Sequence, residues 1–140
     1  MPRLLAICLV LFFLVGCSSQ PKEKVVAVRG RVTQAGAPLQ VSGRDVGLGR
    51  VEVSFHRLQP DGTVSPEFES ASADEQGNFT VRGRNGQGIK PGKYRIAVRQ
   101  WDPDPTDKLE GKFSPEKSPI EREIGESDTT LEIDLAKPTG

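Results

Sequence analysis

The chain has 140 residues, the size of a single domain, and its 19 basic and 19 acidic residues leave no excess positive charge for binding a phosphate backbone. Only 35% of the residues are hydrophobic and many of them precede Cys17, so a core requires that the others recur at regular positions. Fifteen glycines and eleven prolines favour strands and turns over helices.

Near the start of the chain, Arg3 is followed by a long uncharged apolar run, which is the organisation of an export signal. A transmembrane anchor is the alternative, but roughly 13 residues at about 1.5 Å each span only about 20 Å of a hydrocarbon core of about 30 Å. The run ends in Leu14-Val15-Gly16-Cys17, which resembles the lipobox of bacterial lipoproteins. Residues 1–16 are therefore predicted to be a lipoprotein signal peptide.

The lipobox resemblance implies three modifications around Cys17. A diacylglyceryl group is attached to the Cys17 thiol, a signal peptidase cuts between Gly16 and Cys17, and the new amino terminus is acylated with a fatty acid such as palmitate. Since each buried methylene contributes about 0.8 kcal/mol, these chains would hold the protein on the membrane. Residues 17–24 are then the lipidated cysteine and a polar tether. Ser18 stands where an aspartate would signal inner-membrane retention, so the resemblance favours the outer membrane.

Five later segments alternate apolar and polar residues with the period of two that marks a strand with one buried face: 26–33, 51–56, 79–82, 94–99 and 131–135. Two weaker candidates are 64–73 and 119–124. Turn-forming residues lie between these segments, as in Pro60-Asp61-Gly62 and Lys90-Pro91-Gly92. About seven strands in residues 25–138 predict an all-β domain, a seven-stranded two-sheet sandwich.

The order of turns and strand starts resembles the carboxypeptidase-regulatory-like domain. The residues that show it are Gly30-Arg31-Val32, Ala37-Pro38-Leu39, Val51 to Phe55, Ala73 to Phe79, and Pro91 to Val98. The resemblance implies a transthyretin-like (prealbumin-like) Greek-key sandwich, as in small bacterial lipoproteins built from one such domain. Residues 40–49 form a longer link than is usual there. These motifs are specific for a fold and nearly silent on activity.

Strand parity predicts which side chains enter the core. Phe55, Phe79, Tyr94 and Ile96 have the inward parity, whereas His56 has the outward parity and is expected to face solvent. With no thiol in the domain, His56 would need two or more carboxylates to bind zinc, so we predict a surface histidine and no metal.

Catalytic and cofactor sites are not predicted. No Ser/His/Asp set stands at suggestive positions. The loop of Asp102, Asp104 and Asp107 does not match a calcium-binding loop, because Asp107 occupies the sixth position, where glycine is required. We predict a solvated, proline-stiffened loop there.

One strand face is a candidate binding surface. Arg95, Arg99 and Trp101 share the outward face of the predicted strand 94–99 and its continuation, where an exposed tryptophan flanked by arginines would stack on a sugar or on a partner's side chain. The alternative is that Trp101 simply covers the other sheet or a loop.

The sequence thus predicts a non-enzymatic, lipid-anchored protein of the bacterial cell envelope, whose domain in the periplasm or outside the cell is an interaction or structural module. Its expected partners are the membrane, through the lipid on Cys17, and envelope proteins or glycans, with no nucleic acid and no cofactor. A carbohydrate- or peptide-binding module is the alternative, marked by exposed aromatics around Trp101. A transthyretin-like hydrolase of urate breakdown is disfavoured, since those enzymes carry several histidines and this chain has one.

Overall fold

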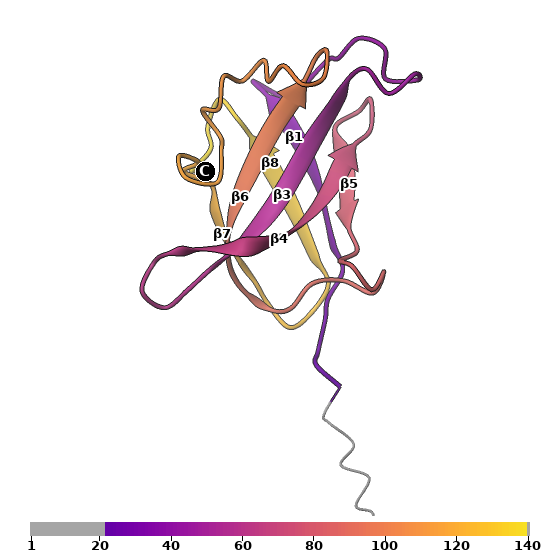
Figure 1. The fold of residues 1–140 in the computed structure, drawn as a ribbon. Helices are drawn as coiled ribbons and strands as arrows, with labels where there is room; N and C mark the ends of the chain where they lie inside the picture. Colours follow the sequence, from indigo (N-terminus) through magenta and orange to yellow (C-terminus); the bar gives the residue numbers. More distant parts are fainter. Residues whose placement is uncertain (1–21, 140) are drawn as a thin grey trace, which may run out of the picture.

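The computed structural model describes residues 22–139, so Gly16, Cys17 and the predicted signal peptide lie outside the described residues. Within residues 22–139 the chain forms eight strands and no helix. The strands are β1 (Val28–Gln34), β2 (Ala37–Pro38), β3 (Arg50–Leu58), β4 (Val64–Ala73), β5 (Asn78–Val81), β6 (Gly92–Trp101), β7 (Glu121–Ile124) and β8 (Thr129–Asp134). They form two four-stranded sheets (Figure 1), which confirms the all-β, two-sheet prediction.

The two sheets differ in how their strands pair. In the first sheet β1 pairs antiparallel with β2 and β5, and parallel with β8. In the second sheet the order is β4-β3-β6-β7, and every neighbouring pair is antiparallel. The long central pair β3 and β6 positions most of the side chains discussed below.

Eight strands form where seven were predicted, and β2 is the additional one. Its residues pair with Thr33 and Gln34 across a turn in which Ala35 and Gly36 both have positive φ, 51° and 79°. A strand of two residues is too short to show a period in the sequence. The other seven lie close to their predicted positions. Strand β1 begins two residues later than predicted, because Val26 pairs with Ile89 in an isolated bridge.

Both sheets contribute to one hydrophobic core, in which Phe55 is fully buried. The Phe55 ring lies 6.2 Å from that of Phe79 on the facing sheet and 6.1 Å from that of Tyr94 on β6, measured between centroids. Ile96, the cross-strand partner of Phe55, is buried as well. The inward parity predicted for these four residues is confirmed.

The turn between β4 and β5 is built around Asp74. Its Oδ1 accepts hydrogen bonds from the backbone N–H groups of Gln76 at 2.9 Å and Asn78 at 2.8 Å. Gly77 has φ of +84°, and a Cβ there would lie 2.3 Å from the carbonyl oxygen of Val32. Only glycine fits this position.

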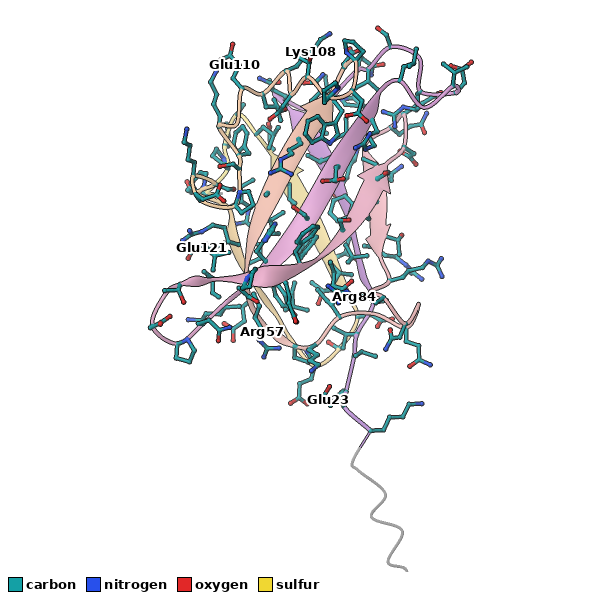
Figure 2. The ribbon with its side chains drawn as sticks, in the orientation of Figure 1. Glu23, Arg57, Arg84, Lys108, Glu110 and Glu121 are labelled. Atoms are coloured by element: carbon teal, nitrogen blue, oxygen red, sulfur yellow. The ribbon has the colours of Figure 1, made fainter. Side chains whose placement is uncertain are left out.

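The two ends of the domain carry different segments. The N-terminal segment leaves at one end, and the first part of the β6–β7 connection lies at the opposite end (Figure 1). Figure 2 shows Glu23 and Arg84 at the first end, and Lys108 and Glu110 at the other. Lys90 pairs with Glu23 at 2.6 Å, an exposed contact between the start of the described chain and the domain.

Candidate functional site

The outer face of the second sheet, on the side away from the core, carries the candidate site. Strand β3 places Glu52, Ser54 and His56 on this face. Strand β6 contributes Arg95, Ala97, Arg99 and Trp101 by pairing, since His56 lies opposite Arg95 and Ser54 opposite Ala97. Cross-strand partners of an antiparallel pair share a face, so these side chains are neighbours.

His56 lies on the predicted face of β3, but the prediction that it faces solvent is wrong. Only 6% of the residue is exposed, and Ser54 beside it is 5% exposed. The reason is that neighbouring segments cover this face. The Phe68 ring of β4 stacks on the imidazole, with centroids 4.9 Å apart, and the 113–120 segment is hydrogen-bonded along the edge of β6.

Ser54 and His56 form a hydrogen-bonded pair. The distance from Ser54 Oγ to His56 Nε2 is 3.0 Å. This pair was not predicted from the sequence, although residues two apart on a strand share a face, so the spacing itself was a usable signal. What the spacing lacked was any indication that the face would be covered.

The environment keeps His56 neutral. Burial lowers the pKa of His56 below its usual 6.5 and Arg99 lowers it further, against smaller opposing effects of a hydrogen bond with the Ser65 backbone and of the Glu116 charge. A neutral imidazole carries its proton on one ring nitrogen only, so which of Ser54 and His56 donates in their hydrogen bond is set by the tautomer of the ring.

A recess of about 320 Å³ lies over this pair. Its polar lining includes Ser54, His56, Arg99 and Glu116, and its apolar wall is formed by Val64, Pro66, Phe68 and Pro115. The Phe68 side chain is 45% exposed, one of three large exposed hydrophobic residues in the described part of the chain, with Val46 and Leu48. The recess therefore combines buried polar groups with an accessible apolar rim.

The three predicted binding residues lie on this face but do not form one cluster. Arg95 pairs with Glu121 of β7 at 2.7 Å. Trp101 is partly buried, and its ring is approached by the guanidinium carbons of Arg50 at 5.4 Å and Arg99 at 5.6 Å. Of the three, Arg99 alone lines the recess described above.

The aspartate loop is held by internal bonds. Asp102 pairs with Lys108 at 2.7 Å and Asp104 with Arg50 at 2.8 Å. Asp107 accepts hydrogen bonds from the backbone N–H groups of Gln100, Leu109 and Gly111. The loop is thus not merely solvated, because its carboxylates are used within the fold. Residues 22–139 contain no cluster of three or more histidine, cysteine, aspartate or glutamate side chains suited to a metal ion.

Comparisons with known proteins return no matching family model, curated protein or solved structure. Among residues 22–139, no helix is long and apolar enough to cross a membrane. The site must therefore be interpreted from its own geometry.

Proposed function

We propose that this chain is a lipid-anchored protein of the bacterial cell envelope, whose single carboxypeptidase-regulatory-like domain binds another envelope molecule and catalyses no reaction. In this proposal the two sheets form a transthyretin-like Greek-key sandwich. The lipobox-like sequence ending in Cys17 supports the anchor, and the placement of seven strands and their turns supports the fold.

The recess on the outer face of the second sheet is the observation that supports binding. The core is built from the inner side of β3, so the buried Ser54–His56 pair on the other side lies outside it. A few polar groups placed in a partly apolar recess are what fix the orientation of a small ligand. The recess lies on the outer face of the β4-β3-β6-β7 sheet, outside the core.

The same geometry favours binding over hydrolysis. Ser54 is almost fully buried, and the other hydrogen bond of His56 is with the Ser65 backbone rather than with a carboxylate. A backbone carbonyl stabilises a protonated imidazole less than the carboxylate of a catalytic triad does. A serine nucleophile here would lack the carboxylate that supports the histidine of a catalytic triad.

The carbohydrate- or peptide-binding alternative is supported by one feature. Phe68 is an exposed aromatic ring beside polar groups, which is the combination that such modules use. Trp101 is less suited to this role, because it is partly buried and two guanidinium groups lie against its ring. We therefore place the contact at the recess.

The anchor is tested by replacing Cys17. We expect Cys17→Ser to lose incorporation of a clickable fatty acid and to leave the membrane fraction, because only the thiol accepts the diacylglyceryl group. Cys8→Ser, which changes the other cysteine of the chain, is the matched control and should label normally. Retained labelling and membrane association in Cys17→Ser would show that the lipobox interpretation is wrong.

A further inference from the structure

Three arginines of the outer face differ in their partners. Arg50 is bound to Asp104 and Arg95 to Glu121. Arg99 makes no hydrogen bond and no ion pair with any residue in the range 22–139, and its side-chain contact is the Trp101 ring at 5.6 Å. Arg99 thus presents a planar fork of unused N–H donors at the recess, held in place by stacking.

The nearby carboxylates do not use this fork. Glu116 lies close enough for its charge and that of Arg99 to affect each other, but its carboxylate is bound within its own turn, by its own backbone N–H and the Ser114 hydroxyl. These bonds lower the pKa of Glu116, so it stays ionised. Glu52, opposite Arg99 on β3, lies within 4.0 Å of Arg50 instead.

The charge of the recess selects the kind of anion. One guanidinium and a neutral His56 face the space, with ionised Glu116 at its edge. A phosphate dianion would bring two negative charges next to ionised Glu116, and Arg99 is the only cation among the residues that line the recess. A carboxylate carries one charge, and its two oxygens match the guanidinium fork in a bidentate pair.

The other lining residues indicate the size and polarity of the rest of the ligand. Phe68, Val64 and the two prolines form an apolar side, and the volume of about 320 Å³ suits a group the size of a sugar ring or a short peptide end. Ser54, once its hydroxyl rotates, and Nε2 of His56 offer further hydrogen bonds at the floor.

We propose that the recess over Ser54 and His56 binds the carboxylate of a small ligand, with Arg99 as the bidentate partner and Phe68 against the ligand body. This specifies the ligand class of the binding module proposed above, and it rests on that proposal for the location in the cell envelope. In the envelope such a carboxylate can belong to a sugar acid or to a peptide C-terminus, and the test below separates these two sources.

The test titrates the mature full-length protein in detergent with two pairs of probes, each pair differing only in or around the carboxylate. N-acetylmuramic acid is compared with N-acetylglucosamine, and N-acetyl-D-alanyl-D-alanine with its C-terminal amide. We expect at least one acid to bind about tenfold or more tightly than its uncharged counterpart, as a bidentate charged pair requires. The acid that binds identifies the source.

Variants then assign the contact to Arg99. Arg99→Gln should weaken acid binding about tenfold or more, and Arg99→Lys should give an intermediate loss, because it keeps the charge without the fork. Arg50→Gln, which removes a partnered arginine of the same face, should leave the affinity within about twofold. Melting curves verify that each variant is folded.

Two results would overturn the proposal. One is that neither acid binds better than its uncharged counterpart at probe concentrations up to about 10 mM, where even a single ion pair would register. The other is binding that Arg99→Gln leaves unchanged in a folded protein. Either result leaves the lipid anchor untouched, since Cys17 labelling tests that separately.

Discussion

The two faces of β3 are both buried, yet they are built from different chemistry. The inner face places Val53 and Phe55 in the common core, while the outer face places Ser54 and His56 under Phe68 and the β6–β7 connection. The inner face excludes water with hydrocarbon alone. The outer face instead carries a buried serine–histidine pair beneath a recess that opens to solvent. Burial alone therefore does not distinguish a hydrophobic core from a binding site.

The largest effect should come from truncating the inner face. Phe55→Ala removes the ring that contacts both Phe79 and Tyr94, and loss of a buried phenylalanine costs about 3–5 kcal/mol of the free energy of unfolding. Urea unfolding followed by circular dichroism measures it. A loss below about 1 kcal/mol would mean that the core is organised around some other residue.

A smaller effect is expected on the outer face. His56→Ala should lower the free energy of unfolding by about 1–3 kcal/mol, because it leaves the Ser54 hydroxyl without its partner and removes the stack on Phe68. Replacing an exposed histidine would lower the free energy of unfolding by about 0.5 kcal/mol or less. The measurement therefore distinguishes a buried, hydrogen-bonded His56 from a solvent-exposed one.

A double-mutant cycle sharpens this result. If Ser54 and His56 are bonded, the losses in Ser54→Ala and His56→Ala should overlap, with a coupling of about 0.5 kcal/mol or more. Additive losses would show that the two side chains do not interact.

The smallest effect is expected in the pH dependence of stability. The pKa of His56 is lowered in the folded protein, so the unfolded chain takes up a proton near 6.5 while the folded one does not. As far as His56 is concerned, the free energy of unfolding should therefore be constant above about pH 7 and fall as the pH drops from about 7 to 5. The pKa values of the Asp61, Asp74 and Asp134 carboxyl groups are lowered below 3.8 in the folded protein. The stability that these carboxylates contribute is therefore lost at lower pH than that of His56.

His56→Gln is the control for this window. This variant should remove the fall in the free energy of unfolding between about pH 7 and 5, while the further fall at lower pH, which comes from the carboxylates, should remain. An unchanged slope in this variant would assign the proton uptake to another group.

The strands and turns could be predicted because their signals are local. Alternation along β3 and β6 decides which side chains face each other, and Asp74 and Gly77 set a turn within five residues. The cover over His56 could not be predicted in this way. It comes from Phe68, on another strand, and from the 113–120 segment, which has no regular period.

The binding residues show the same limit. Arg99 was identified with Arg95 and Trp101 because all three share one strand face. What distinguishes Arg99 is that Asp104 and Glu121 bind the other arginines, Arg50 and Arg95, and these partners come from remote parts of the chain. Parity along one strand contains no information about such partners.

The parallel pairing of β1 with β8 has a consequence for the order of folding. Val28 lies beside Thr129 and Thr33 beside Asp134, so a strand near the start of the domain is completed by one near its end. Contacts between such distant parts of a chain form slowly, and until they form β1 keeps one bare edge. Synthesis must therefore reach β8 before the first sheet can close. A chain that is to be exported, as we propose for this one, would keep this sheet open until β8 has been made.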